Sequence, residues 1–441
     1  MSEDVTGYQY FMQPEPRKNL GAIRLEQDEV FGRRVKVRDV SVGMVRNASD
    51  ANRKTVKVFL EPYPHVRIEK AKDLQGWYKG ANERNQVRPR PCYTEALLTE
   101  PYGGFCPVGC AHCYINSGMR GYRGTGLVTV PVNYGEQIAA QLSKIHWASA
   151  GYFTSFHDPF NVLETVYHNS QQAAQSFTDV GLPIFFLSRL RYPLWAINQL
   201  RKSKYSYAQK SINTPDADDW KKLSPGALPL DEQMEDIRRL KRSGIYVSIQ
   251  VNPIIPGVTS NKQIIELFEM LAEAGADHVI VKFVEAAYPW AATMVEKMVA
   301  RFGERGKQFG KLFTQNIGGE RTVDEDYRLS AHKLLGLHAK RLGLTYSVCY
   351  EYCYERDGNG KILSKTGISI GPKVTTSDQC HGHRVPCFYR DDLNEKFHEV
   401  AECPKTGCLY CASNNKGKPR CGDTLMGEAP AIRLVDLKRS R

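Results

Sequence analysis

The stretch that decides the fold runs from residue 246 to residue 283 and reads YVSIQVNPIIPGVTSNKQIIELFEMLAEAGADHVIVKF. It begins and ends with short apolar runs rich in β-branched residues, which are typical of buried strands. Between them, Ser260 is a good N-cap, and the apolar residues from Ile264 to Leu271 share one helical face. Gly275 suits the left-handed position after the last turn. The pattern predicts a strand–helix–strand unit with parallel strands.

Similar patterns lie on both sides of this unit. Apolar strands are predicted over residues 94–99, 151–156, 183–188, 206–212, 246–251 and 278–283, and a further helix over 134–143. Strands that alternate with helices predict an α/β fold, here a partial or complete βα barrel. We assign the barrel to residues 91–351 and a cysteine-rich C-terminal module to residues 352–441. Residues 1–90 form an N-terminal extension with candidate strands over 35–42 and 54–60.

Three cysteines follow the first predicted barrel strand at the spacing C-x3-C-x2-C, namely Cys106, Cys110 and Cys113. Active sites of βα barrels lie at the carboxyl ends of the strands, which is where this loop falls. Thiolates are the usual ligands of iron–sulfur clusters, and three of them leave one iron of a [4Fe–4S] cluster open. A zinc site is the alternative, but it would need a fourth ligand and usually uses C-x2-C pairs.

This loop resembles the signature of the radical S-adenosylmethionine (SAM) superfamily. The resemblance implies a [4Fe–4S] cluster that binds SAM and cleaves it to a 5′-deoxyadenosyl radical, with an electron donor such as flavodoxin or ferredoxin. Looser motifs resemble the spore photoproduct lyase branch of that superfamily. They are Asp158-Pro159-Phe160 followed by Glu164, Ser188-Arg189, Lys210-Ser211-Ile212, and the turn from Asn252 to Gly257.

The resemblance also implies roles for individual residues. It assigns the carboxylate and ribose of SAM to Ser188, Arg189 and Ser211, because an arginine fork can bind a carboxylate in a bidentate manner. Tyr114 would lie near the adenine, and Asp158 would contact the cofactor or instead cap the next helix. The catalytic candidates are His157, which could equally be a satisfied strand-end histidine, and Tyr207, which could return a hydrogen atom to a product radical.

One departure from the lyases bears on the reaction. Those enzymes repair a thymine dimer and use a cysteine near the end of the second strand as a hydrogen donor. This chain has no cysteine between Cys113 and Cys349, and Thr154, Ser155 and His157 occupy the corresponding stretch. A hydroxyl group is a poor hydrogen-atom donor. The departure therefore favours a redox-neutral rearrangement over dimer repair.

The C-terminal module contains a second group of cysteines. Four of them, Cys403, Cys408, Cys411 and Cys421, are predicted to bind a metal, either zinc or a second iron–sulfur cluster. The remaining candidates could form a further site or supply a redox thiol near the barrel mouth. These are Cys349, Cys353, Cys380 and Cys387, together with His381 and His383.

The charge pattern favours an anionic partner. The net charge is +12, and residues 189–210 combine arginines, lysines and aromatics without an acidic residue. With a second basic loop at 301–321, this pattern predicts binding to nucleic acid, although a solvated helix face over core aromatics would look the same. The predicted function is a radical SAM enzyme that rearranges a modified thymine base in DNA.

Other functions stay open at this point. The alternatives are modification of a peptide or small molecule, cleavage of a DNA lesion, and a non-enzymatic zinc-dependent protein that binds nucleic acid. The sequence has neither an apolar run long enough to span a membrane nor a secretory signal, so a cytoplasmic location is expected.

Overall fold

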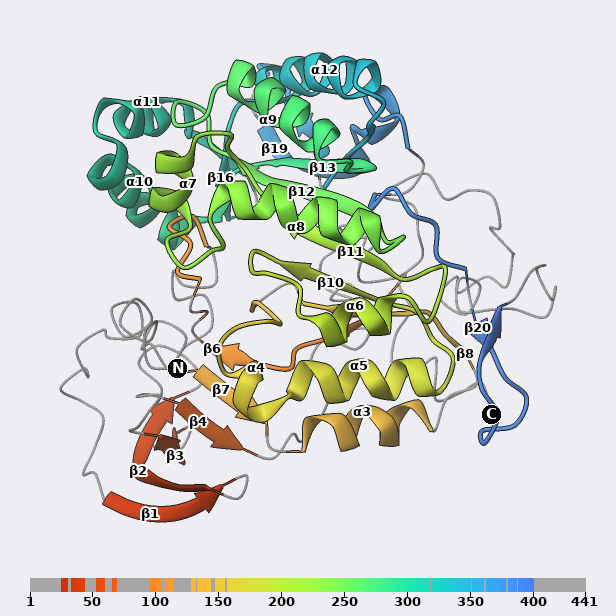
Figure 1. The fold of residues 1–441 in the computed structure, drawn as a ribbon. Coiled ribbons are helices and arrows are strands. Elements are labelled where there is room, and N and C mark those ends of the chain that lie inside the picture. Colours follow the sequence, from red (N-terminus) through yellow and green to blue (C-terminus); the bar gives the residue numbers. More distant parts are fainter. Residues whose placement is uncertain are drawn as a thin grey trace.

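The computed structural model describes residues 25–30, 33–43, 53–59, 66–69, 96–104, 106, 108–113, 128–131, 133–143, 147–154, 157–317, 319–349, 351–360, 362–377, 380–386 and 388–399. A seven-stranded sheet forms the centre of the molecule, and all of its neighbouring strands run parallel (Figure 1). Helices connect the strands. This arrangement confirms the predicted α/β class.

The order of strands in the central sheet is β17-β13-β12-β11-β10-β9-β5. Their bounds are β5 (Ala96–Thr99), β9 (Ala150–Phe153), β10 (Ile184–Ser188), β11 (Tyr207–Ser211), β12 (Tyr246–Ile254), β13 (His278–Phe283) and β17 (Thr345–Val348). Six of these were predicted from the sequence, and β17 was not. Because β5 and β17 are the two edges, the sheet is a partial barrel rather than a closed one.

Helices cover the outer face of the sheet (Figure 1). Their bounds are α3 (Tyr134–Leu142), α4 (Glu164–Tyr167), α5 (Asn169–Asp179), α6 (Leu194–Leu200), α7 (Ala217–Leu223), α8 (Leu230–Arg242), α9 (Asn261–Glu273) and α12 (Glu325–Arg341). Helix α9 begins as predicted, because Ser260 and Gln263 form a capping box. Gly275 follows it with φ of +90°, where glycine avoids the cost of a β-carbon.

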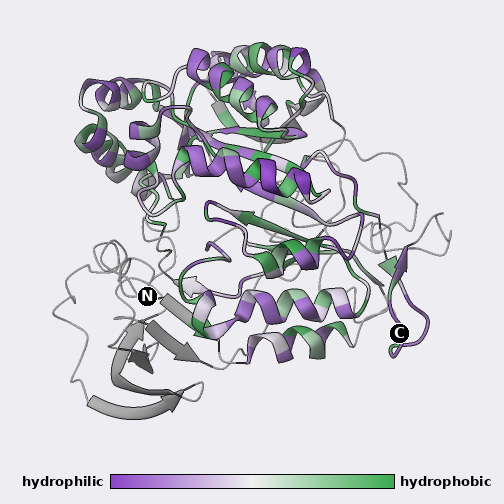
Figure 2. Ribbon diagram, viewed as in Figure 1, coloured by the Kyte–Doolittle hydropathy of each residue, from purple (hydrophilic) through white to green (hydrophobic). Residues whose placement is uncertain are grey.

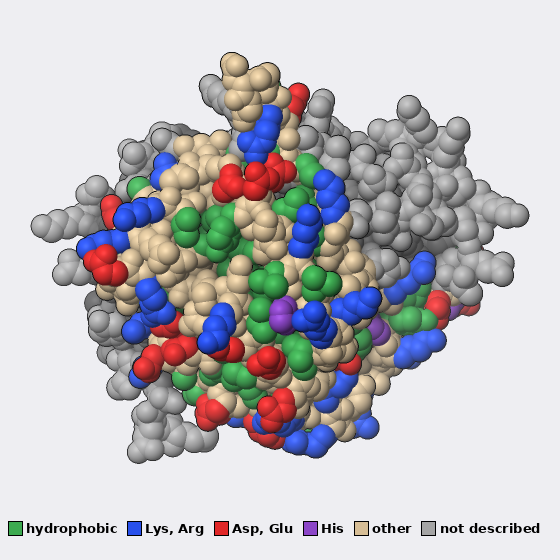
Figure 3. Space-filling model, turned by 90° about the horizontal axis from the view of Figure 1, so that it is seen from above, with side chains coloured by type: hydrophobic (Ala, Val, Ile, Leu, Met, Phe, Trp, Pro, Cys, Tyr) green, Lys and Arg blue, Asp and Glu red, His purple; other side chains and the backbone are tan. Residues whose placement is uncertain are grey.

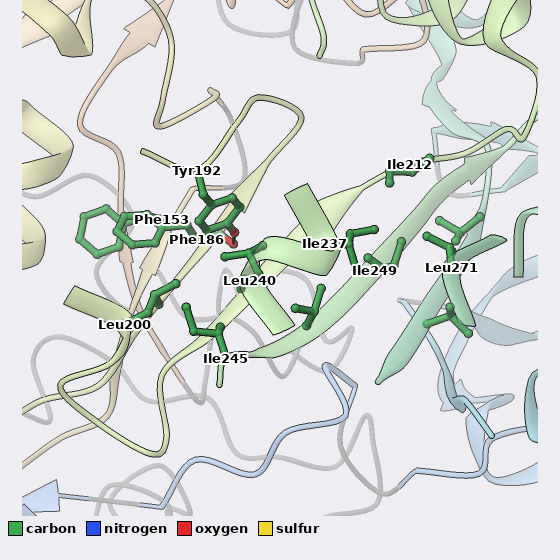
Figure 4. Packing of buried hydrophobic residues seen from close by; sticks show 14 of the residues in the cluster. Phe153, Phe186, Tyr192, Leu200, Ile212, Ile237, Leu240, Ile245, Ile249 and Leu271 are labelled. Atoms are coloured by element: carbon green, nitrogen blue, oxygen red, sulfur yellow. Dashed lines mark hydrogen bonds between the residues drawn. The ribbon is translucent and has the colours of Figure 1, made fainter. Parts of the chain in front are cut away.

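The main core lies between the sheet and these helices. Figure 4 shows Phe153, Phe186 and Ile249 from the strands facing Leu240 and Leu271 from the helices. Each is fully buried or nearly so, and burial of one such side chain contributes roughly 1.5–3 kcal/mol. In Figure 2 the helices carry hydrophilic residues on their outward faces. This one-sided pattern explains why the period read from the sequence predicted the elements well.

A helical lobe follows β13. It contains α10 (Tyr288–Phe302), α11 (Glu304–Leu312) and a small sheet of β14 (Glu285–Ala287), β15 (Gln315–Ile317) and β16 (Glu320–Thr322). The prediction of a basic loop over residues 301–321 was therefore wrong, because much of it is α11. Phe309 is fully buried and anchors this helix, and Gly303 separates it from α10 with φ of +56°.

The predicted N-terminal strands are confirmed as β2 (Arg33–Gly43) and β3 (Arg53–Phe59). They belong to a six-stranded sheet with β1 (Leu25–Val30), β4 (Val66–Glu69), β7 (Val128–Pro131) and β6 (Gly103–Gly104). Strand β4 pairs with β7 in parallel. The N-terminal sheet therefore includes strands from both sides of residue 90.

The described part of the C-terminal region begins with a hairpin. The hairpin consists of β18 (Tyr352–Arg356) and β19 (Ile362–Ser369), and the 3-10 helix η3 (Gly371–Lys373) follows it. Strand β20 (Phe388–Tyr389) then pairs between β8 (Trp147–Ala148) and β21 (His398–Glu399). Within the described residues, no helix is long and apolar enough to cross a membrane.

The segment Cys380–His383 packs beneath the central sheet, and we call it the floor segment. The carbonyl of Cys380 lies 3.0 Å from Nε2 of His278, and Tyr246 donates 2.9 Å to the carbonyl of Gly382. Both partners are the first residues of their strands. The floor segment therefore closes the amino end of the sheet and leaves its carboxyl end to the cysteine loop.

Candidate active site

The cysteine loop presents three thiols at the carboxyl end of β5. Cys106, Cys110 and Cys113 form no disulfide among the described residues and are partly exposed. Two turns shape the loop, since the N–H of Gly109 donates 3.1 Å to the carbonyl of Cys106, and that of Cys113 donates 3.1 Å to Cys110. Gly109 has φ of +65°, which glycine adopts without strain.

Two backbone hydrogen bonds attach the loop to the end of α7. The N–H of Ala111 donates 2.8 Å to the carbonyl of Leu223, and that of Gly226 donates 3.0 Å to Val108. Ala111 is also buried in the cluster that contains Met298 of α10. The helical lobe thus holds the cysteine loop from one side.

Charges of both signs surround the thiols. Burial raises the pKa of Cys106, and the neighbouring charges of Asp158, Cys110 and Cys113 raise it further. Two half-buried cations of α10 face the loop. Burial lowers the pKa of Lys297, and the charge of Cys113 acts to raise it. Burial likewise lowers the pKa of Arg301, and the charge of Cys110 acts to raise it.

This donor set fits a [4Fe–4S] cluster, which takes thiolate ligands and is tuned by nearby charge. Across the described residues, no three His, Cys, Asp or Glu side chains are gathered as a site for a single metal ion.

Arg189 lies beside the loop and is 9% exposed. Its guanidinium donates to Oγ of Ser224 at 3.1 Å and to the carbonyl of Asn252 at 3.2 Å, and lies 3.3 Å from Nε2 of His112. It also stacks over Trp220, 5.2 Å from the ring centroid. Burial and the charge of Arg189 lower the pKa of His112. No carboxylate of the described residues pairs with Arg189, which makes it suited to bind an anion.

Asp158 joins the carboxyl ends of β9 and β10. Its carboxylate accepts from Oγ of Ser188 at 2.9 and 3.0 Å, from the N–H of Arg189 at 2.8 Å and from that of Phe160 at 3.0 Å. Burial raises its pKa, and these donors act against that rise. The structure therefore brings together Asp158, Ser188 and Arg189, with Ser211 at the corresponding end of β11.

The two catalytic candidates occupy different places. His157 is 5% exposed, next to Asp158, and its Nδ1 lies 3.2 Å from the carbonyl of Asp158. Tyr207 is the first residue of β11, and its hydroxyl lies 2.5 Å from Nδ1 of His381 in the floor segment. Tyr207 is thus at the opposite end of the sheet from Ser188 and Ser211. Tyr114 and the cysteines Cys387, Cys403, Cys408, Cys411 and Cys421 lie outside the described residues.

The acid-free stretch 189–210 is not one surface patch, contrary to its interpretation as a basic face. Lys210 is fully buried and forms a 2.7 Å ion pair with Asp236. Arg191 pairs with Glu232, and Tyr192 is buried. On the face in Figure 3, Lys and Arg side chains are likewise mixed with Asp and Glu side chains. Acidic partners from later elements therefore neutralise charges that appear unopposed in the sequence.

Sequence reasoning missed several residues near the thiols. They are His112 as a partner of Arg189, Ser224, which donates 3.4 Å to Sγ of Cys110, and the two cations of α10. No local pattern could have found Ser224, Lys297 or Arg301, because each reaches the loop only through the packing of distant elements.

Comparisons with known proteins add the following. No family model matches the chain. The chain is 54% identical over 442 residues to the radical SAM Nα-GlyT isomerase of Pseudomonas phage M6, covering 98% of this chain and 92% of that protein. A spore photoproduct lyase mutant covers 64% of this chain and 81% of its own with 14% identity and a TM-score of 0.49. Streptococcus suis SuiB bound to S-adenosylmethionine gives 16% identity over 55% of this chain and 48% of its own, with a TM-score of 0.36.

Proposed function

The chain belongs to the radical SAM enzymes, in the family of the Nα-GlyT isomerase, and we propose that it isomerises a glycyl group carried on its α-nitrogen by a thymine base in DNA. The observation that carries this proposal is 54% identity along nearly the whole chain. Membership of the family implies SAM and a [4Fe–4S] cluster as cofactors. We propose a DNA base as the carrier because the net charge of +12 favours a polyanionic substrate.

We assign the cluster to Cys106, Cys110 and Cys113 and the carboxylate of SAM to Arg189. When bound, the two cofactors supply a carbon radical, and the protein orients them and excludes water. Arg189 suits a carboxylate because it is buried beside the loop and pairs with no acidic side chain of the described residues. Asp158 and Ser188 hold the backbone of Arg189 in place. The cluster needs one electron from an external donor, for which flavodoxin or ferredoxin is the expected class.

The rearrangement itself is redox-neutral. One hydrogen atom leaves the glycyl α-carbon, the bond from the thymine methylene to the α-nitrogen breaks while a bond from that methylene to the α-carbon forms, and one hydrogen atom returns to the nitrogen, so no oxidant is consumed. The product has the same mass as the substrate. Because a base inside a duplex cannot meet a site at the carboxyl end of a barrel, the target base must leave the stack.

The test uses the full chain, reconstituted anaerobically with iron and sulfide and supplied with SAM and dithionite. One substrate is an oligonucleotide whose thymine carries an N-glycyl group on the 5-methyl carbon, and the other is a peptide with N-glycyl threonine. We expect a new nucleoside of unchanged mass after nuclease digestion, together with 5′-deoxyadenosine. Cys110→Ala should abolish both. If the peptide is isomerised and the DNA is not, the substrate is a peptide rather than a thymine base.

A further inference from the structure

A nearly buried ion pair lies at the carboxyl end of β13, outside the residues assigned above. Along this strand Val279, Val281 and Phe283 belong to the outer core, so Ile280 and Lys282 face the other side, which is the inside of the partial barrel. Nζ of Lys282 lies 2.6 Å from Oε2 of Glu285, and each side chain is only 11% exposed. The pair is therefore on the inner face, at the same end of the sheet as the cysteine loop.

Lys282 and Glu285 lie at one end of a longer array of charges, namely the end that faces the inside of the partial barrel. Behind it, Arg328 of α12 pairs with Glu351, and both are buried. Burial alone would raise the pKa of Glu351, but the charge of Arg328, with those of His332 and Lys282, holds it at about 2. The charges of the array alternate in sign, and Arg328 and Glu351 are fixed by burial. Lys282 and Glu285 form the end of the array that is nearest the inner face of the sheet.

A second feature, at the carboxyl end of the neighbouring part of the sheet, also indicates a ligand. Asn213 follows β11, is fully buried, and donates from Nδ2 to the carbonyl of Pro253 at 3.1 Å. Its Oδ1 has no hydrogen-bond partner among the described residues. The next residue of β12, Ile254, pairs with Phe283, which adjoins Lys282. An unpartnered acceptor and an ion pair thus lie across β12 from one another.

Neither feature is explained by stability. A buried ion pair is rarely more stable than apolar side chains of the same size, because removing two charges from water costs as much as their attraction returns. A buried amide oxygen without a donor costs a further 1–3 kcal/mol, roughly. Both features become favourable when a ligand with a carboxylate, a cationic amine and an N–H donor is bound.

We propose that Lys282, Glu285 and Asn213 form the subsite for the zwitterionic glycyl group of the substrate. The ammonium of Lys282 binds the glycyl carboxylate, the carboxylate of Glu285 faces the glycyl amine, and Oδ1 of Asn213 accepts from an N–H of the substrate. The subsite rests on the proposed function, because it binds the glycyl group that the thymine base carries. It would select against substrates that lack either charge.

The test measures binding rather than turnover. Affinities of the full chain, loaded with cluster and SAM, are compared for the N-glycyl oligonucleotide and for the same oligonucleotide as its glycyl methyl ester. Lys282→Met should weaken binding of the free acid by about 10-fold to 100-fold and leave the ester unchanged, since only the acid offers a carboxylate. The double variant Lys282→Met/Glu285→Gln avoids an unpaired buried carboxylate and should show the same loss.

Lys307→Met is the matched control, because Lys307 and Glu304 form an ion pair at the same sequence spacing on the exposed surface of α11. It should bind both ligands as the wild type does. If the wild type distinguishes acid from ester and both Lys282 variants do so equally well, the subsite is wrong and the proposed function stands. If the wild type binds acid and ester equally well, the subsite is wrong and the proposed function stands; if it binds neither oligonucleotide, the DNA substrate is wrong and the subsite falls with it.

Discussion

The hydroxyl of Ser224 donates a hydrogen bond of 3.4 Å to Sγ of Cys110. Hydrogen bonds to the sulfur ligands of an iron–sulfur cluster stabilise its more negative, reduced state. We therefore expect Ser224→Ala to make the reduction potential of the reconstituted cluster more negative without preventing its assembly. A redox titration followed by electron paramagnetic resonance measures this change. Ser143→Ala, at the exposed end of α3, is the control, and equal potentials in both variants would exclude the effect.

Arg189→Met should weaken the binding of SAM. Loss of hydrogen bonds between a buried guanidinium and a carboxylate costs about 1.5–3 kcal/mol, which corresponds to an increase in Kd of roughly 10-fold to 100-fold. Arg189→Lys should recover little, because an ammonium cannot bind in a bidentate manner. Anaerobic equilibrium dialysis with labelled SAM gives the affinities. Arg201→Met, at the exposed end of α6, should bind as the wild type does, and a similar loss there would point to a general effect of charge.

The sequence predicted most of the fold because the helices and strands of the barrel each have one apolar face. The exception is β17, whose sequence TYSV contains two hydroxyl residues and no apolar run. The site was predictable only as far as local motifs reach, which is the cysteine loop and the strand-end residues. Lys210 was interpreted as a surface cation because its partner, Asp236, lies on a later helix and is adjacent only after folding.

Lys210→Met should destabilise the protein strongly. Lys210 and Asp236 are both fully buried, and Asp236 also accepts from Arg239 and from the N–H of Tyr192. Removing Lys210 takes away one of the two cations that compensate the buried carboxylate of Asp236, and breaking such a pair costs up to about 3–5 kcal/mol. Unfolding in urea measures the loss. Lys262→Met, which removes an exposed pair with Glu266 at 3.9 Å, should change the free energy of unfolding by less than about 0.5 kcal/mol.

Acidification below pH 6.5 should destabilise the fold through His278. Burial lowers its pKa to about 3. Between these values the unfolded chain takes up a proton at this residue and the folded chain does not, so the free energy of unfolding falls as the pH falls. At pH 5 the loss from His278 amounts to about 2 kcal/mol. His278→Gln should flatten the dependence between pH 7 and pH 5 in urea titrations, whereas His398→Gln, at an exposed position, should leave its slope unchanged.

The floor segment has a consequence for the order in which the molecule is completed during synthesis. The last barrel strand, β17, leaves the ribosome before residues 380–383 do. Until those residues are synthesised, Tyr207, Tyr246 and His278 lack the floor segment that they contact. Gly382 must then seat against the ring of His278, where a β-carbon would come within 2.3 Å of Cγ. A chain that ends at residue 351 would keep every strand of the central sheet and still lack the floor segment at the amino end of that sheet. The barrel is therefore finished by the region that follows it.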